Sequence, residues 1–240
     1  MTPVPDKTIG QLAVECPHYI PVFEAHQLDY YQRGHRSLAQ ACQEAGLETA
    51  QVLRELEAQK PQPFLTDVDE NSSLFDIVHF IVGRHHSYVR GQLERMEDLI
   101  QGVGGDGQAE TQVSVLKRHF LGLDESLRRH LLEEEIEVFP RLVWIERNRL
   151  GKGMEDHGRD FREAIHHVLM DHHFMDRDFL ELKKLVFHFR VLDPGSEFLE
   201  GFSKALDGLD QDNHRHIHLE NNILLRKAVA LGILKGPAAG

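Results

Sequence analysis

The sequence predicts an all-α protein, an up-down four-helix bundle preceded by a small helical domain. Three observations favour this fold class. Apolar residues recur every three or four positions over long segments, which is the spacing of amphipathic helices. Proline is nearly absent from these segments, and none alternates apolar and polar residues as a half-buried strand would. Short stretches rich in glycine or proline separate four long segments, as expected for the helices of a bundle.

Composition excludes several classes of protein. The chain has 240 residues, a net charge of −12, 41% hydrophobic residues and two cysteines. The acidic balance argues against a nucleic-acid partner, which requires a basic surface, and no apolar run approaches the ~20 residues of a membrane span. Two cysteines cannot build a disulfide framework, and the N-terminus lacks the pattern of a signal peptide. We therefore expect a cytoplasmic protein with neither a membrane nor a nucleic-acid partner.

Residues 1–60 are expected to form a small helical domain. The helical pieces predicted within it are 9–14, 19–26 and 37–56. A Pro-Gln-Pro sequence then begins a polar stretch over 61–73, which we interpret as a linker because closely spaced prolines favour extended backbone. The bundle is predicted over 74–232.

Each of the four bundle helices has one apolar stripe. Ser72-Ser73 can cap the first helix, and glycine-rich loops at 102–107 and 148–158, with Asp193-Pro194-Gly195-Ser196, separate the helices. The stripe residues, helix by helix, are Phe75, Val78, Val82, Val89, Leu93, Met96 and Ile100; Leu116, Phe120, Leu123, Leu127, Val138, Leu142 and Ile145; Ile165, Val168, Met175, Phe179, Leu182, Val186 and Phe189; and Phe198, Phe202, Leu206, Leu209 and Ile223.

Polar residues interrupt every stripe near its middle. Each helix has one histidine where an apolar residue is expected, and the second and fourth helices have a glutamate one turn later. These six residues are His86, His130, Glu134, His172, His216 and Glu220. Burying two carboxylates without partners would cost on the order of several kcal/mol each, and a bound metal removes that cost.

The spacing of these residues suits a site for two metal ions. A histidine and a glutamate four positions apart lie on one helix face, about a turn apart. Each histidine can bind one ion while the glutamates bridge both, and imidazole with carboxylate suits iron or manganese. The pattern therefore predicts a carboxylate-bridged dinuclear site inside the bundle. A bundle without metal is the alternative, since a single buried histidine is more often a core residue than a ligand.

Neighbouring residues leave two assignments open. His173 adjoins His172, and a shift of one residue would exchange them, although the flanking positions of His172 make the better apolar stripe. Asp176 lies four residues after His172, on the same face, and is a candidate for a further ligand.

His85 adjoins His86 but is expected to point about 100° away from it. His214 and His218 flank His216 on other faces, where a solvated or ligand-orienting role is favoured over a surface metal site.

Several segments resemble the di-iron proteins that repair iron–sulfur clusters, which combine a hemerythrin-like bundle with a small N-terminal domain. The segments are Ile9-Gly10-Gln11-Leu12, Leu28-Asp29-Tyr30, Arg84-His85-His86, His130 to Glu134 followed by Phe139-Pro140, Asp171-His172, and His216 to Asn222. The resemblance covers nearly the full length, and the last segment is the most specific. It implies that the four stripe histidines bind two non-haem iron ions, which Glu134 and Glu220 bridge.

The chain departs from the family pattern in two places. Family members usually carry Cys-Cys-Gly-Gly in the small domain, where this chain has Tyr30-Tyr31-Gln32-Arg33-Gly34, and this argues against a thiol-based role for that domain. Close relatives have a further histidine ligand near the end of the first helix, whereas this chain has no histidine between His86 and His119. Asp176 or water is the candidate for that position.

The resemblance implies repair of iron–sulfur clusters under nitrosative or oxidative stress, by donating iron or by reducing nitric oxide at the iron pair. The implied partners are damaged iron–sulfur proteins, with nitric oxide or dioxygen as small ligands. The alternative is a hemerythrin-like binder or sensor of dioxygen, nitric oxide or iron without turnover. Whether the protein is an enzyme stays open at this point, as does its oligomeric state, a homodimer included.

Overall fold

The computed structural model describes residues 4–60, 68–102, 108–148 and 158–234. Within these ranges the chain is helical and contains no β-strand, and one isolated bridge joins Thr8 and Ser37. The all-α prediction is therefore confirmed. Most of the predicted linker over 61–73, and most of the predicted loops at 102–107 and 148–158, lie outside the described residues.

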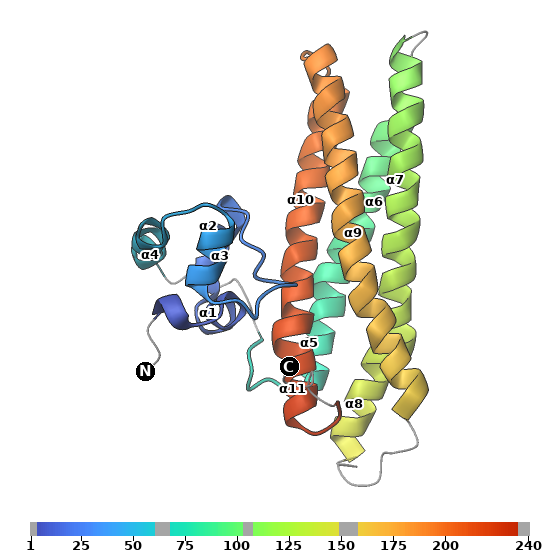
Figure 1. Ribbon diagram of the computed structural model, residues 1–240. Helices are drawn as coiled ribbons and strands as arrows, with labels where there is room; N and C mark the ends of the chain where they lie inside the picture. Colours follow the sequence, from blue (N-terminus) through green and yellow to red (C-terminus); the bar gives the residue numbers. More distant parts are fainter. Residues whose placement is uncertain (1–3, 61–67, 103–107, 149–157, 235–240) are drawn as a thin grey trace. The chain divides into compact units, whose positions relative to one another are not determined.

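Short helices form the N-terminal part and long helices follow (Figure 1). Their bounds are α1 Ile9–Glu15, α2 Ile20–Ala25, α3 Leu38–Glu44, α4 Thr49–Ala58, α5 Leu74–Phe80, α6 Ser87–Gln101, α7 Gln108–Glu133, α8 Phe139–Asn148, α9 Gly158–Leu192, α10 Glu197–Leu219 and α11 Leu225–Ala230. The π-helical segments are Ile81–His86, Glu134–Val138 and Glu220–Leu224. No helix in the described ranges has the length and apolar character needed to cross a membrane.

The chain divides into two compact units, one formed by Met1–Ile81 with His214–Gly240 and the other by Val82–Asn213.

In the first unit, Thr8 and Ser37 are the cap residues that precede the helices α1 and α3. Each side-chain oxygen accepts a hydrogen bond from the backbone N–H three residues later, and the glutamine at that position accepts one from the cap residue's backbone N–H. This reciprocal capping satisfies two donors that a helix start leaves open.

The single helix predicted over 37–56 is wrong, because the chain forms α3 and α4 with a turn between them. Gly46 has a φ of +68°, and the N–H of Leu47 donates to the carbonyl of Cys42 at 2.8 Å. This is the pattern of a helix that ends on a glycine in the left-handed region, which glycine adopts at low cost. The helical periodicity continues through the turn, and only the glycine marks the break.

The short helices enclose an apolar core of their own. Burying each large side chain of this kind stabilises the fold by roughly 1.5–3 kcal/mol. The core residues are Ile9, Leu12, Ala13, Ile20, Val22, Phe23, Leu28, Tyr30, Leu38, Ala41, Cys42, Val52 and Leu56.

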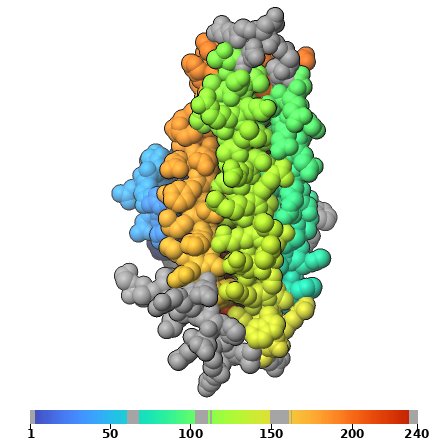
Figure 2. Space-filling view, turned by 90° about the vertical axis from the view of Figure 1, so that its right-hand side faces the viewer, coloured from blue at the N-terminus to red at the C-terminus, as the bar shows by residue number. Residues whose placement is uncertain are grey.

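Four helical segments lie side by side in the unit formed by residues 82–213, namely α6, α7 with α8, α9 and α10 (Figure 1). Figure 2 shows α7 and α9 as neighbours along their length. Most of the predicted stripe residues meet in one continuous core between these helices. Its buried residues are Val89, Leu93, Met96, Ile100, Leu116, Phe120, Leu123, Leu127, Leu131, Met175, Phe179, Leu182, Val186, Phe189, Leu199, Phe202, Ala205, Leu206 and Leu209.

The buried face of α5 differs from the predicted stripe. Phe75 is 43% exposed, whereas Leu74 and Ile77 are buried. The physical reason is the π-helical segment Ile81–His86, because a π turn holds more residues than an α turn. The residues before that segment are therefore offset by about one position from the face that continues at Val89.

Candidate metal centre

The π-helical segments occur where the sequence predicts metal ligands. His86 is the last residue of Ile81–His86, while Glu134 and Glu220 are the first residues of the other two segments. A π turn breaks the regular ladder of hydrogen bonds and re-aims the side chains around it, and such turns are frequent at functional sites. The backbone is thus locally distorted at three of the six predicted ligands.

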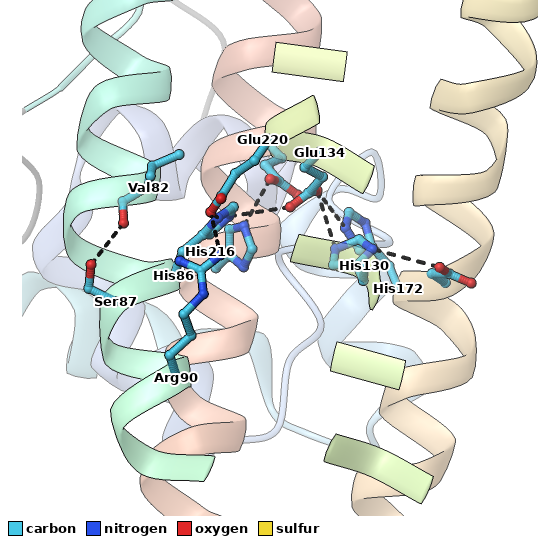
Figure 3. A network of polar contacts seen from close by, with 11 residues as sticks. Val82, His86, Ser87, Arg90, His130, Glu134, His172, His216 and Glu220 are labelled. Atoms are coloured by element: carbon cyan, nitrogen blue, oxygen red, sulfur yellow. Dashed lines mark hydrogen bonds and ion pairs between the residues drawn. The ribbon is translucent and has the colours of Figure 1, made fainter. Parts of the chain in front are cut away.

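Three imidazoles surround the carboxylate of Glu134 in the unit formed by residues 82–213 (Figure 3). Nε2 of His86 lies 3.3 Å from Oε2, Nε2 of His130 lies 3.2 Å from Oε1, and Nε2 of His172 lies 4.0 Å from Oε1. All four side chains are almost completely buried. The structure therefore brings together four of the six predicted ligands around one carboxylate.

The other two predicted ligands form a buried pair in the unit that contains residues 214–240. Nε2 of His216 lies 2.8 Å from Oε1 of Glu220. The pair repeats the arrangement of His130 and Glu134, because in both cases the histidine lies four residues before a glutamate that begins a π-helical segment. Both pairs therefore present imidazole and carboxylate on one helix face.

The geometry around Glu134 fits a metal cation. Bonds from a metal to imidazole nitrogen or carboxylate oxygen are about 2.0–2.2 Å, so neighbouring ligand atoms at right angles lie about 3 Å apart. The two shortest Nε2–Oε distances, from His130 and His86, are close to that value. A buried carboxylate is costly unless positive charge lies nearby, and a cation supplies it. Nitrogen and oxygen donors suit iron, manganese or zinc.

Glu135 orients the imidazole of His86 from the side opposite Glu134. Oε1 of Glu135 lies 2.6 Å from Nδ1 of His86 and 2.7 Å from the guanidinium of Arg90. Burial by itself would raise the pKa of Glu135, but the hydrogen bonds from His86 and Arg90 outweigh it and lower the pKa below its usual value. The ionised carboxylate favours a proton on Nδ1, so the lone pair that can bind metal is on Nε2.

The neighbours of the predicted ligands differ in burial. His172 is buried and His173 is exposed, so His172 is the residue that faces the interior. His85, expected on another face, is 6% exposed, with Nδ1 3.1 Å from Oδ1 of Asp212. The wider π turn explains this, because it changes the angle between successive residues. Asp176 is partly buried, and among the described residues it is not one of those that cluster within 4.8 Å as potential ligands.

The Tyr30-Tyr31 turn contacts the helix that carries His216 and Glu220, within one compact unit. Nδ2 of Asn222 donates to the carbonyl of Tyr30 at 3.0 Å, and Nδ2 of Asn221 donates to the carbonyl of Tyr31 at 3.1 Å. The ring of His218 packs edge-on against Tyr30. The turn where family members carry two cysteines is therefore an aromatic docking contact in this chain.

Two further contacts strengthen this docking. The guanidinium of Arg215 makes two hydrogen bonds to the carboxylate of Glu24, at 2.8 and 2.9 Å, a geometry that adds specificity as well as energy. His218 also accepts a hydrogen bond from Asn222 at 3.0 Å. Burial, with a smaller contribution from Arg226, lowers the pKa of His218 to about 3, so this ring is neutral at physiological pH.

Sequence reasoning missed Glu135, which contacts the predicted ligand His86, and Asn222, which contacts Tyr30 and His218. Asn222 lies in the most specific of the segments that resemble the repair family, and this was the one available signal for it. Glu135 lies within a run of three glutamates, where nothing in the pattern distinguishes an orienting residue from a solvated one.

Comparison with known proteins matches both parts of the chain. Residues 78–228 match the hemerythrin HHE cation-binding domain, and residues 5–60 match a domain of unknown function, DUF542. An iron–sulfur cluster repair protein, YtfE of Yersinia pseudotuberculosis serotype O:1b, is 25% identical over 228 residues, which cover 93% of this chain and 97% of that protein. YtfE of Yersinia pestis strain Pestoides F is 24% identical over 226 residues, with the same coverage.

The helical bundle and its buried histidines and glutamates define a cation-binding helical protein. The chain belongs to the hemerythrin HHE cation-binding family, since that family's model covers more than half of its residues. It also resembles the iron–sulfur cluster repair proteins over almost their whole length, small N-terminal domain included.

Proposed function

We propose that this protein binds two iron ions and repairs iron–sulfur clusters damaged by nitrosative or oxidative stress. The observation that carries the proposal is the convergence of His86, His130 and His172 on the buried carboxylate of Glu134. Membership of a cation-binding family and the resemblance to proteins named for cluster repair support it. The clients would be damaged iron–sulfur proteins.

His216 and Glu220 would complete the proposed site. They lie at the end of α10, and the earlier part of that helix, at Phe202 and Leu209, packs in the same core as the helices that carry His130 and His172. Glu134 and Glu220 would bridge the two ions, and the four histidines would bind them. The His216–Glu220 pair has the same spacing as the His130–Glu134 pair. This supports the assignment of the glutamates as bridging ligands and the histidines as terminal ligands, because each pair offers one of each.

The chain's own residues would hold, orient and shield the iron. The imidazoles would bind the iron through Nε2, and Glu135 would keep the proton of His86 on Nδ1. An iron pair would supply redox chemistry on small molecules such as nitric oxide or dioxygen, and iron that can be released to a damaged cluster. The six proposed ligands are almost completely buried, which limits access of bulk water.

A non-catalytic binder or sensor of dioxygen, nitric oxide or iron is the second candidate. The Tyr30-Tyr31 turn, which stands where family members carry two cysteines, favours this binder or sensor over a mechanism that needs thiols in the small domain. Cys42 is buried, and burial raises the pKa of its thiol as it does that of Cys16. A raised pKa leaves less of each thiol in the thiolate form that binds metal. Two free cysteines are consistent with the cytoplasm, where we place the protein.

Metal analysis with Mössbauer spectroscopy tests the proposed site. Protein purified from iron-replete cells should hold about two irons per chain in a bridged pair, as a dinuclear carboxylate site requires. Glu134→Ala should lose iron, whereas Glu137→Ala, at an exposed position three residues further on, should retain it. Zinc in place of iron, or no metal, would overturn the proposal.

A reactivation assay separates repair from binding. A cluster-dependent hydratase inactivated with nitric oxide should regain activity when the iron-loaded protein is added, and the Glu134→Ala variant should not restore it. Reversible binding of dioxygen or nitric oxide without reactivation would instead support the binder or sensor.

A further inference from the structure

The buried face of α10 contains one polar residue to which the proposed metal site gives no role. Asn213 is 1% exposed, and its Nδ2 is buried without a hydrogen-bond partner in the described residues. An amide buried in this way is costly, because it loses its hydrogen bonds to water and gains none in return. Native proteins satisfy most buried polar groups, so this exception requires a physical reason.

The matching position of α7 shows that packing does not require an amide. On both helices, the inward residues alternate between intervals of four and three, and both series end on the histidine and glutamate of a proposed ligand pair. The series on α7 is Leu116, Phe120, Leu123, Leu127, His130 and Glu134, and that on α10 is Phe202, Leu206, Leu209, Asn213, His216 and Glu220. Leu127 and Asn213 therefore occupy equivalent positions, three residues before the histidine, and Leu127 is fully buried and apolar.

A ring contact between α7 and α10 places Asn213 at the height of a proposed ligand, within the unit formed by residues 82–213. The ring centroids of Phe120 and Phe202 lie 5.8 Å apart, and the two helices run in the same direction (Figure 1). Asn213 follows Phe202 by eleven residues, and His130 follows Phe120 by ten. At about 1.5 Å per residue, Asn213 and His130 lie at similar heights along the bundle.

The residue before Asn213 gives the same height. Oδ1 of Asp212 lies 3.1 Å from Nδ1 of His85. Asn213 and His86 are the next residues along the chain, and they therefore lie in the same layer of the bundle. Asn213 faces inward, since it follows the buried Leu209 by four residues on the same helix face. The amide thus lies on the inward face of α10, in the layer that carries proposed ligands.

The chemistry of the amide nitrogen limits what it can contact. Nδ2 of an asparagine donates hydrogen bonds and accepts none, so it cannot bind a cation. A buried asparagine can fix the register of packed helices through a polar partner across the interface, but Nδ2 of Asn213 has no such partner in the described chain. A small molecule that accepts a hydrogen bond would supply the missing partner.

We propose that Asn213 is a positioning residue, whose Nδ2 donates a hydrogen bond to a small ligand such as nitric oxide, dioxygen or azide at the metal centre. This inference rests on the proposed di-iron site and deepens it, because it assigns a donor that favours ligands with partial or full negative charge. A donor fixed in a buried site is effective, since bulk water does not compete for it.

Azide binding to the iron-loaded full chain tests the proposal. Asn213→Leu introduces the residue of the matching position on α7, and it should keep its iron. It should bind azide about tenfold less tightly, as loss of one hydrogen bond predicts. Leu209→Met is the matched control, one turn earlier on the same buried face, and it should leave the azide affinity unchanged. Titration followed by absorption measures the affinity, and metal analysis measures the iron.

Infrared spectroscopy of bound azide separates a hydrogen bond from a change in packing. In the wild type, the azide stretching frequency should shift when ordinary water is replaced by heavy water, because the amide protons exchange. Asn213→Leu should lose this shift, whereas Leu209→Met should keep it. The metal-free chain gives a readout without iron. Asn213→Leu should raise its melting temperature by about 2–4 °C, because an apolar side chain replaces an amide without a partner.

The outcomes distinguish this inference from the proposed function. A wild type that holds no iron overturns the metal site, and the role of Asn213 with it. If the wild type holds iron and Asn213→Leu binds azide equally well, the inference alone is overturned. The same conclusion follows if the iron-loaded wild type binds no azide. Loss of iron from Asn213→Leu also overturns the inference, because Asn213 would then be needed for metal binding itself.

Discussion

Nδ1 of His86 lies 2.6 Å from Oε1 of Glu135, the residue next to the proposed ligand Glu134. Neighbouring glutamates thus lie on opposite sides of one imidazole, since Oε2 of Glu134 is 3.3 Å from Nε2 of the same ring. This arrangement is possible because a π-helical segment begins at Glu134 and alters the directions of successive side chains. One carboxylate would bind the metal and the other would fix the ring that binds it.

The first prediction concerns this orienting carboxylate. Glu135→Gln should weaken metal binding by about 10–100-fold, because the amide holds the proton of His86 on Nδ1 less strongly than the carboxylate does. Competition with a chelator, followed by iron absorption, measures the affinity. Glu137→Gln is the control, since its exposed side chain lies two residues away on the same segment. Equal affinities in the two variants would contradict a role for Glu135.

The sequence predicted the helices and the inward-facing histidines and glutamates because both depend on local spacing. Apolar residues at intervals of three and four fix which face of a helix is buried, and this holds throughout α7 and α9. The prediction was wrong where the spacing itself changes. A π turn at Ile81–His86 has no marker in the residues that form it, so the buried face was assigned to Phe75 instead of Leu74.

Contacts between distant parts of the chain were beyond the reach of the sequence pattern. Asn222 donates to the carbonyl of Tyr30 across 192 positions, and Arg215 binds Glu24 across 191. No periodicity links such residues, because their meeting depends on how folded helices pack. Long-range hydrogen bonds to backbone carbonyls also place no demand on the residue type that supplies the carbonyl.

The second prediction distinguishes the adjacent histidines of α9. His172→Ala should lose iron and lower the free energy of unfolding together, because metal binding contributes directly to folding stability. His173→Ala should keep its iron, since this side chain is exposed. Iron content and thermal unfolding of both variants, with and without chelator, provide the measurements. If His173→Ala loses iron as readily as His172→Ala, the assignment of the inward face of α9 is incorrect.

The third prediction tests the docking of the small domain through a close backbone approach. A Cβ added at Gly10 would lie 2.5 Å from Oδ1 of Asn222 and 2.9 Å from the carbonyl of Gly34. Gly10→Ala should therefore destabilise the protein by about 1–3 kcal/mol, as overpacking does. Gly91→Ala is the matched control, because a Cβ at this exposed position of α6 meets nothing within 4 Å. It should stabilise the helix by about 0.5–1 kcal/mol. Urea unfolding measures the free energy of unfolding of both variants. If Gly10→Ala leaves it unchanged, Asn222 and Gly34 shift at little cost to accommodate the added Cβ.

The fourth prediction concerns the response of the docked turn to alkaline pH. Burial, followed by the negative charge of Glu24, raises the pKa of Tyr30 well above its usual value. The folded protein keeps the phenol neutral, whereas the unfolded chain loses that proton at about pH 10. Tyr30 therefore contributes stability that is complete below about pH 10 and falls as the pH rises beyond it, by up to about 1.4 kcal/mol per pH unit. Tyr30→Phe has no such proton, so its free energy of unfolding should depend less on pH in this range. Urea unfolding at about pH 9 and about pH 11, on either side of the unfolded tyrosine's pKa, compares the two chains. If both lose the same free energy of unfolding between these pH values, Tyr30 is not the group responsible.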